Sequence, residues 1–488
     1  MTSANRLQLT TVVEVTPGVT PPSPRMRTAR ITGESVSFNP EYTDSEELRA
    51  DRMIGDPILV MQSSGGGINF ELSYPDDNSP MSDFIKCAFW NNWANTPSRD
   101  NDGVADSIIT DVAATGVITV TAGPAFGVGH LVRTTGFGVA QNNGVFRVTT
   151  GSATVPSVGA GLLAVEAAPL GTARMKVVGA EGVAGDITAT ATGLASTALN
   201  FTTLGLVVGQ TLKIGGTAAI TKFNTAANNV FVRITAITAT ALTLDNLPSG
   251  WAIDAGAAKT IRIWFGDQIK NGVTRTSMSI ERGFLGQIVP SYIMTSGMHV
   301  NTMQMNFPLK DKIKGSMAFK GLGGGVSTVS VDASPDPATT SPVMSANADF
   351  QRFTEGGATV TGPNWIKSAE FTINNNLRMT ESISSLSPVD VVNGEFNVNG
   401  KADIYFGDNT ILNKFYNGTP TSIFMASLKQ NRGVVFQFPR ITYRGGTNPS
   451  ASGKNTDVMM SLDWSSSFDP LTASHALMER YEYVEKSN

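Results

Sequence analysis

The order of predicted secondary-structure elements occurs twice in this chain, and this repetition limits the fold more than any other feature. Residues 31–38 alternate apolar and polar side chains as a half-buried strand does, and a strand at 68–74 and a helix at 81–90 follow. The same order returns after residue 340, in strands at 366–373 and 397–406 and a helix at 410–416. The strand at 434–443 is expected to match 274–282, and the strand at 458–465 to match 300–307 or 313–320. We therefore predict a tandem duplication of one β-rich domain.

The first copy holds a polar segment and a glycine run between its strands. Residues 39–56 contain many acidic residues and arginines without an apolar stripe, which predicts a long loop. Residues 57–62 favour a strand, and the Ser-Ser-Gly-Gly-Gly run at 63–67 predicts a turn before the strand at 68–74.

Composition changes sharply inside the first copy. Residues 105–265 contain 16 charged residues in 161, against 60 in the other 327, and their short strand-like runs alternate with Gly and Asn turns. This pattern predicts an all-β insertion. Residues 128–133 resemble 208–213, and 142–149 resemble 228–235. The weak repeat favours two small β-modules of about eighty residues each, with chance similarity in a low-complexity segment as the alternative.

These patterns divide the chain into five parts. They are an extended, proline-rich arm at 1–26, a first domain formed by 27–104 and 266–320, the insertion at 105–265, a Gly/Ser/Pro linker at 321–340 and a second domain at 341–488. The expected fold class is mainly β, with tandem domains that each carry one helix and with an inserted all-β domain.

Charge and rare residues exclude several classes of function. A net charge of −4 gives no basic surface for gripping nucleic acid. A single cysteine, Cys87, excludes a disulfide scaffold and a multi-cysteine zinc site. The N-terminus lacks the pattern of a secretory signal, and no apolar run is long enough to span a membrane. We expect a soluble protein made in a reducing cytoplasm.

Enzyme chemistry finds little support in the sequence. There is no phosphate-binding loop and no nucleophile elbow. Asp76, Asp77 and Asp83 could act as paired acids, but a helix cap and a surface acid explain them better. Carboxylates at Asp100, Asp102 and Asp106 could wrap calcium, with a plain polar turn as the favoured alternative. We predict no enzyme and no cofactor beyond this candidate calcium site.

Several segments resemble the tail tube proteins of phages with long, non-contractile tails (the siphophage type). They are SEELRADRMIGDPILVMQSSGGGINFELSY, DFIKCAFW, TRTSMSIERGF and VNTMQMNFPLKDKIKGSMAFKG in the first copy, and VMSANADFQRF, INNNLRMTESISSLSPVDVVNGEFNVNGKADIYFGDNTILNKF and SLDWSSSFDP in the second. The resemblance covers about 1–100 and 266–488 and leaves out the insertion.

The resemblance implies β-sandwich or half-barrel domains whose sheets join between subunits into stacked rings, forming a hollow tube that delivers DNA. Single-domain members of the family form six-fold rings, so a duplicated chain is expected to need three copies. The family's long loop reaches the adjacent ring, which makes Arg49, Asp51 and Arg52 candidates for ion pairs between rings. A solvated charged loop is the alternative. An isoelectric point near 5.6 suits a channel through which DNA must slide.

The resemblance also implies partners and a location. Expected partners are further copies of the chain, a tape-measure protein in the lumen, and tail terminator and distal tail or baseplate proteins, with double-stranded DNA passing through transiently. The insertion is expected on the outside as a decoration, with host glycans as candidate ligands. The protein would belong to the virion tail, assembled in the bacterial host cytoplasm without membrane contact. The alternative functions are a cell-surface or virion β-module adhesin and a polysaccharide-cleaving enzyme.

Overall fold

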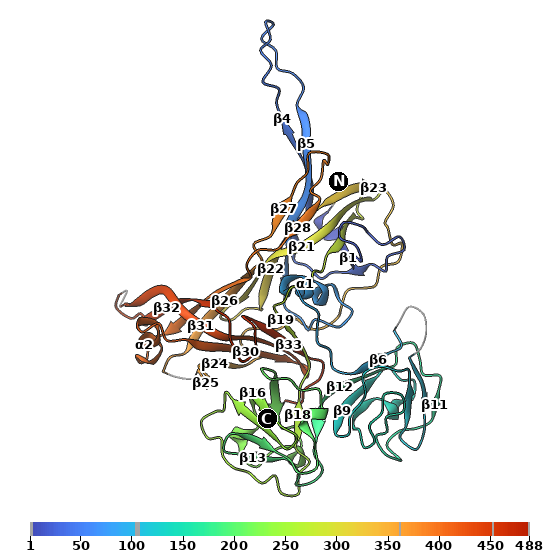
Figure 1. Cartoon of the computed structure of the whole chain (residues 1–488), viewed down its shortest axis with the longest axis vertical. Helices are drawn as coiled ribbons and strands as arrows, with labels where there is room; N and C mark the ends of the chain where they lie inside the picture. Colours follow the sequence, from blue (N-terminus) through green and yellow to red (C-terminus); the bar gives the residue numbers. More distant parts are fainter. Residues whose placement is uncertain (1–2, 103–107, 361–362, 451–452, 487–488) are drawn as a thin grey trace.

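A computed structural model of the chain describes residues 3–102, 108–360, 363–450 and 453–486. Nearly all of its regular structure is antiparallel sheet, with two α-helices among the described residues. Two copies of one β-domain form the upper and middle parts of the molecule in Figure 1, and two smaller lobes from the insertion lie at the opposite end from a long hairpin.

The first copy consists of two layers that share one long strand. Its elements are β1 (Leu7–Val13), β2 (Arg27–Thr28), β3 (Gly33–Glu34), β4 (Ser37–Thr43), β5 (Ile58–Glu71), α1 (Pro80–Phe89), β20 (Met278–Phe284), β21 (Ser291–Phe307), β22 (Lys314–Gly321) and β23 (Gly323–Ser327). The N-terminal half of β21 pairs with β20 and β23, and its C-terminal half pairs with β22, which continues to β5.

The second copy repeats these pairings in the same order. Its elements are β24 (Phe350–Glu355), β25 (Ala358–Thr359), β26 (Ile366–Asn374), β27 (Arg378–Thr380), β28 (Asp390–Val392), β29 (Asn397–Tyr405), α2 (Thr410–Tyr416), β30 (Thr421–Lys429), β31 (Arg432–Ser450), β32 (Met459–Ser466) and β33 (Leu477–Tyr481). Strand β31 pairs with β30, β32 and β33, as β21 does with β20, β22 and β23. The predicted match of 434–443 with 274–282 is therefore wrong, because β31 corresponds to β21 and β30 to β20.

The two helices follow their sequence signals. The Ser79 hydroxyl caps α1 by accepting a hydrogen bond from the Ser82 N–H, and Pro80 occupies the first turn, where no N–H is needed. The helix begins and ends one residue earlier than predicted, since Trp90 adopts the left-handed conformation. The apolar side chains of α1 enter the core, and α2 has its predicted bounds.

The glycine run at 63–67 does not turn the chain. Strand β5, which is 14 residues long, runs straight through it. Residues 39–43 of the predicted loop form part of β4, which pairs with β5. The glycines are needed because neighbouring backbone lies very close. At Gly66 the φ angle is +101°, and a Cβ atom would lie 2.0 Å from the Ser35 carbonyl oxygen.

Two segments expected outside the domains contribute strands to the first copy. Residues 7–13 of the expected arm form β1, which pairs along its whole length with β20 and is the counterpart of β24. The expected linker begins with β23, which pairs with β21. Gly324 allows this pairing, since a Cβ there would lie 2.5 Å from the Met294 carbonyl oxygen.

One continuous sheet joins the two copies. Strand β21 pairs with β26 from Thr302↔Asn374 to Phe307↔Ala369, so the order β5-β22-β21-β26-β29-β32-β31 crosses from one copy into the other. A single apolar core cluster lies behind this sheet and contains residues of both copies. The copies therefore fold as one body.

The insertion has its own sheet and its own apolar core. The sheet strands are β6 (Ser98–Asp100), β9 (His130–Thr135), β10 (Gly144–Arg147), β12 (Arg174–Glu181), β13 (Thr188–Thr190), β14 (Gly193–Ala195), β15 (Thr211–Ile214), β16 (Phe231–Ile237), β17 (Ala241–Asp245) and β18 (Arg262–Trp264). A small sheet contains β7 (Ile109–Val112), β8 (Ile118–Val120) and β11 (Glu166–Ala167). The central order β10-β9-β12-β18-β15-β16 mirrors itself about the β12–β18 pair.

The repeat seen in the insertion sequence has a counterpart in its hydrogen bonds. The Asn143 side chain donates to the Phe137 carbonyl and accepts from the Phe137 N–H, both at 3.0 Å. The Asn229 side chain makes the same two bonds with Phe223, at 3.0 and 2.9 Å. Each asparagine thus closes an equivalent loop between two strands of its lobe.

The close contact at Gly66 gives a direct test of the continuous strand. Gly66→Ala should lower the free energy of unfolding by about 1–3 kcal/mol, because the backbone must shift to admit the Cβ. Gly325→Ala in β23 is the matched control, since a Cβ there would meet nothing within 4 Å. Thermal unfolding of both variants measures the difference, and equal losses would contradict this account.

Candidate functional site

An apolar interface joins the insertion to the second copy. An apolar cluster between them contains Phe424, Leu428, Val435 and Tyr481 from β30, β31 and β33, and Leu131, Val178, Phe231 and Trp264 from the insertion sheet. All eight side chains are buried, and burial of each large apolar side chain stabilises by about 1.5–3 kcal/mol. The insertion is therefore packed against the second copy along a sheet face.

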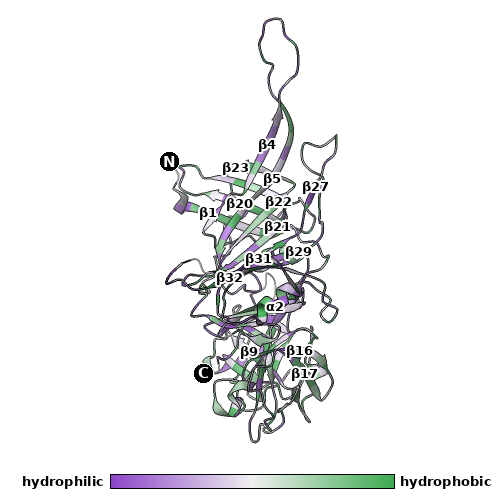
Figure 2. Cartoon of the chain, turned by 90° about the vertical axis from the view of Figure 1, so that its left-hand side faces the viewer, coloured by the Kyte–Doolittle hydropathy of each residue, from purple (hydrophilic) through white to green (hydrophobic). Residues whose placement is uncertain are grey.

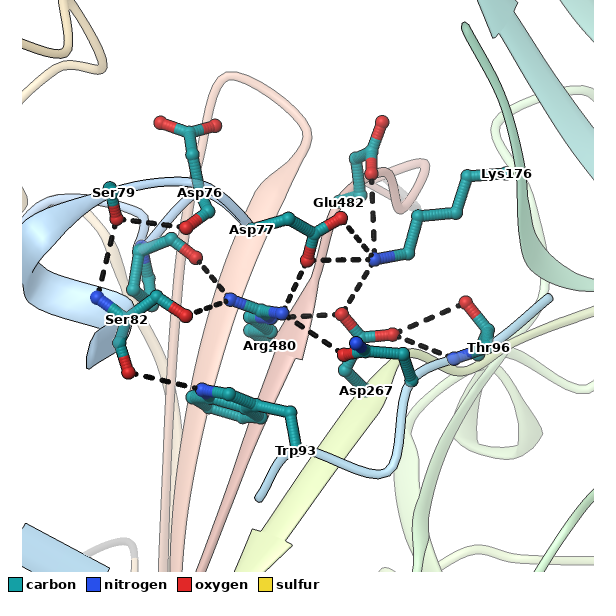
Figure 3. A network of polar contacts seen from close by, with 12 residues as sticks. Asp76, Asp77, Ser79, Ser82, Trp93, Thr96, Lys176, Asp267, Arg480 and Glu482 are labelled. Atoms are coloured by element: carbon teal, nitrogen blue, oxygen red, sulfur yellow. Dashed lines mark hydrogen bonds and ion pairs between the residues drawn. The ribbon is translucent and has the colours of Figure 1, made fainter. Parts of the chain in front are cut away.

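A buried ionic network lies beside this cluster (Figure 3). The Asp267 carboxylate on β19 (Asp267–Lys270) accepts from Lys176 Nζ at 2.6 Å and from Arg480 Nε at 2.8 Å. Asp77 contacts the same two cations, at 2.9 Å from Lys176 Nζ. These residues come from the first copy, the insertion and β33, so the network ties three parts of the chain together.

The network satisfies its charges internally. Asp77, Asp267 and Glu482 face Arg174, Lys176 and Arg480, and Asp100 lies at the edge of the network beside Arg174. Burial by itself would raise the pKa of Asp77, but the positive charges of Lys176, Arg480 and Arg174 lower it well below its ordinary value. Asp77 therefore stays ionised throughout the physiological range.

Arg480 is the centre of the network and is 1% exposed. One terminal nitrogen donates to the Pro75 carbonyl at 2.9 Å and to the Ser82 hydroxyl at 2.8 Å, and the guanidinium lies 4.2 Å above the Trp93 ring. The planar fork of arginine can serve all of these partners at once. Local sequence patterns do not reveal this role for Asp77, for which they predict a helix cap or a surface acid.

Two arginines of the insertion, one on each of the central strands β12 and β18, form ion pairs with the segment that follows β33. Arg174 on β12 binds Glu482 at 2.8 Å, and Arg262 on β18 binds Glu485 at 2.6 Å. Each lobe of the insertion thus holds one carboxylate of the segment that follows β33.

Glu479 is a buried acid inside the same interface. Its Oε1 accepts from the Thr211 N–H at 2.9 Å and from Gln437 at 2.9 Å, and its Oε2 lies 3.0 Å from the Tyr481 hydroxyl. The single Tyr481 hydroxyl hydrogen can bond the Thr211 carbonyl at 2.8 Å, which leaves a protonated Glu479 to donate to Tyr481. Burial raises the pKa of Glu479 to about 7.

The shared sheet ends in two strand edges that lack a partner among the described strands. The outer edge of β3 and β4 is one, and residues 445–450 of β31 are the other. These edges are the counterparts of β26 and of the C-terminal half of β21, which pair with each other inside the chain. At the first edge, the Val36 N–H bonds to the Glu34 carboxylate at 2.9 Å. Open edges of this kind invite pairing with another chain.

The hairpin of β4 and β5 extends beyond the body as an arm and ends in residues 44–57 (Figure 2). Arg49 at its tip binds Asp51 at 2.7 Å and Glu47 at 3.7 Å, so these charges are paired within the arm. Arg52 has no ion-pair partner among the described residues, and its φ angle is +59°. The structure of one chain leaves the expected inter-ring role of Arg49, Asp51 and Arg52 as a prediction.

The candidate calcium residues face arginines. Asp100 lies 3.6 Å from Arg174, and Asp102 lies 3.4 Å from Arg25. Asp106 lies outside the described residues. Within the described part of the chain, no three His, Cys, Asp or Glu side chains form a group that could hold a metal ion.

Comparison with known proteins identifies the class. A family model described as "Phage tail tube protein" matches residues 4–249 and 236–466. The chain therefore belongs to the phage tail tube family and is a structural tail protein rather than an enzyme. The two matches meet inside the insertion, so they do not divide the chain where the strand pairing does. A search of curated proteins gives no significant match. None of the described helices is long and apolar enough to cross a membrane.

The network should carry a large share of the stability of the docked insertion. Asp267→Asn removes one carboxylate from two buried cations and should cost about 3–5 kcal/mol. Asp51→Asn is the matched control, because it breaks an exposed ion pair with Arg49 and should leave the thermal midpoint unchanged. Similar midpoints for both variants would show that the buried pair contributes no more than the exposed one.

Glu479 should make stability depend on pH. The unfolded chain releases this proton near pH 4.5, whereas the folded chain holds it up to about pH 7, so stability falls as pH rises between these values. Glu479→Gln should abolish this fall and give a variant more stable than the wild type at pH 8, by about 3 kcal/mol. Thermal midpoints between pH 4 and 8 test this, with Glu46→Gln on the arm as the control. A wild-type slope retained in Glu479→Gln would exclude Glu479 as the source.

Proposed function

We propose that three copies of this chain close into a ring, and that rings stack into the tail tube through which phage DNA passes. The observation that carries the proposal is the β21–β26 pairing, which already joins the two copies as two ring neighbours would be joined. Repeating the same pairing between chains uses both open edges. With six-fold rings in single-domain relatives, three two-copy chains complete one ring.

The internal pairing gives the register between chains. Gln304 pairs with Thr372 across the copy junction. Thr447 is the counterpart of Gln304, because Thr447 pairs with Ser461 on β32 as Gln304 pairs with Ser316 on β22. Ser37 is likewise the counterpart of Thr372, since Ser37 pairs with Gly65 on β5 as Thr372 pairs with Asn399 on β29. Thr447 of one chain should therefore face Ser37 of the next.

The shared sheet supports a role as the wall of the bore. Its strands alternate buried apolar residues with a polar face, on which Asn69, Gln304 and Asn399 are exposed. Lys314, Lys401, Glu370 and Asp463 on the same strands mix both signs of charge. A polar face without a cationic excess would not hold phosphates, so DNA could slide.

The arm and the insertion have separate places in this proposal. The arm reaches the adjacent ring, where Arg49, Asp51 and Arg52 take part in contacts between rings. The insertion decorates the outside of the tube, supported by its packing against the apolar face of β30, β31 and β33 rather than against the polar face of the shared sheet. Aromatic residues of the insertion are all buried or half-buried where described, so no exposed ring supports glycan binding.

Further partners follow from the tube. A tape-measure protein would occupy the lumen during assembly, with tail terminator and distal tail or baseplate proteins at the ends. The long, non-contractile tail type belongs to the same proposal, as does assembly in the host cytoplasm.

A cysteine pair tests the ring. The double variant Ser37→Cys, Thr447→Cys should form disulfides between chains under oxidation, because directly opposed residues bring their Cβ atoms within about 5.5 Å. The covalent ladder should end at three chains, matching the mass of rings seen by negative-stain electron microscopy. Native Cys87 is buried and should not interfere.

The control is the pair Gln304→Cys, Thr372→Cys, which should form a disulfide within one chain and no ladder. A ladder ending at six chains would keep the edge pairing and refute the trimer. A stable monomer at high concentration with tail initiator proteins supplied would refute the tube and favour the adhesin.

A further inference from the structure

The shared sheet has two distinct ends. The arm leaves one end, where the pairing of β5 with β22 stops at Ser64↔Gly321. At the other end β5 finishes at Glu71 opposite Lys314, and β21 finishes at Phe307 opposite Ala369. In a stack of rings, the arm end of one ring must face this second end of the next.

An aromatic groove opens at the second end. It has a volume of about 480 Å³ and lies at the junction of the two copies, between the end of β21 and the strands β24 and β26. Its lining includes Phe307, Leu309, Phe350, Val360 and Trp365. Trp365 is 58% exposed and Leu309 46% exposed, so large apolar surface faces solvent in the single chain.

The tip of the arm carries matching apolar side chains. Leu48, Met53 and Ile54 are 101%, 68% and 84% exposed, and the tip projects beyond every other described segment of the chain (Figures 1 and 2). Three large apolar residues on a projecting hairpin indicate a contact with another molecule.

The charges of the arm and the groove are complementary. Residues 44–56 contain five acidic residues and two arginines, a net charge of −3. Among the described residues that line the groove, Lys367 is exposed and none is a carboxylate, while Arg352 is buried and bonds to the Phe231 and Asn246 carbonyls of the insertion. Lys310 is exposed beside Leu309. An acidic segment with an apolar tip therefore suits this groove both by its apolar side chains and by its charge.

In the described part of the chain, the arm occurs once and the aromatic groove lies at the one junction between the two copies. The counterpart cavity of the first copy, beside Leu9, Ala29 and Ile31, is smaller at about 300 Å³. Its lining contains both Arg30 and Glu71 and no aromatic side chain, so it suits an acidic, apolar tip less well. The counterpart of the arm in the second copy is the loop of β27 and β28, which lies back against the arm through a 2.6 Å bond from the Gln62 N–H to the Leu386 carbonyl.

We propose that the arm tip of one ring docks into the Phe307–Trp365 groove of a second copy in the next ring. This inference rests on the proposed ring, and it names the surface that receives the arm. The apolar residues Leu48, Met53 and Ile54 fill the groove, while the acidic residues of the tip face Lys310 and Lys367. Because arm and groove occur once per chain, three such contacts join each pair of rings.

Two complementary variants test the docking. An arm variant carries Leu48→Ser, Met53→Ser and Ile54→Ser, and a groove variant carries Leu309→Ser and Trp365→Ser. Each alone should form rings of wild-type mass but at least ten-fold fewer stacked tubes in electron micrographs. When the two variants are mixed, pairs of rings should form, because the arms of the groove variant can enter the grooves of the arm variant. Stacks of more than two rings should not form, because the remaining arms and grooves of such a pair are the altered ones.

The matched control is Ile383→Ser on the β27–β28 loop, a fully exposed isoleucine at the same end of the molecule, which should leave tube length unchanged. Thermal midpoints of all variants establish that they are folded. Single variants that stack like the wild type, or a mixture that yields no paired rings, would overturn the docking while leaving the ring in place. A folded arm variant that forms no rings would show that the arm closes rings instead, and would also overturn it.

Discussion

Strand β21 is the element on which the rest of the structure depends. Its 17 residues pair with β20 and β23 near one end and with β22 and β26 near the other, so it belongs to both layers of the first copy and to the second copy as well. A β-sheet edge left open is a liability for a single chain. Here one pair of edges is closed internally and an equivalent pair remains open, which gives the chain both a shared core and a means of self-association.

Duplication alone does not make the two copies equal, because their outer faces differ in polarity. By strand register, Phe424 and Ala426 on β30 correspond to Glu281 and Gly283 on β20. Phe424 packs against the insertion, whereas Glu281 accepts hydrogen bonds from Ser330 and the Val331 N–H of its own copy. Only the second copy therefore presents an apolar face for the insertion. The buried charges beside that face fix the orientation of the insertion on the second copy, since each charge pairs with a residue from another segment of the chain.

Local sequence patterns predicted the elements well and their long-range pairings less well. The helix at 410–416 was predicted with its bounds because its apolar spacing and its flanking Asn and Gly residues are local signals. The prediction of a turn at 63–67 was wrong. The glycines are needed there because the backbone near Ser35 lies very close to Gly66, which no local pattern reveals. The roles of Asp77 and Arg480 were missed for the same reason, since they meet across 403 positions of sequence. The expected match of 434–443 with 274–282 is wrong, whereas the pairing of β32 agrees with 313–320, one of the two expected matches of 458–465. Alternating strands look alike in sequence, and only their pairing distinguishes them.

The single insertion has a consequence for the symmetry of the assembled tail. In the proposed ring of three chains, the inner wall would repeat its strand pattern six times per turn, because both copies contribute the same sheet. The outer surface would repeat only three times, since the insertion packs on the second copy alone. The DNA inside the tube would therefore meet a six-fold surface, and the medium outside would meet a three-fold one. Any protein that caps the wall can use a six-fold pattern, while one that grips the exterior must be three-fold.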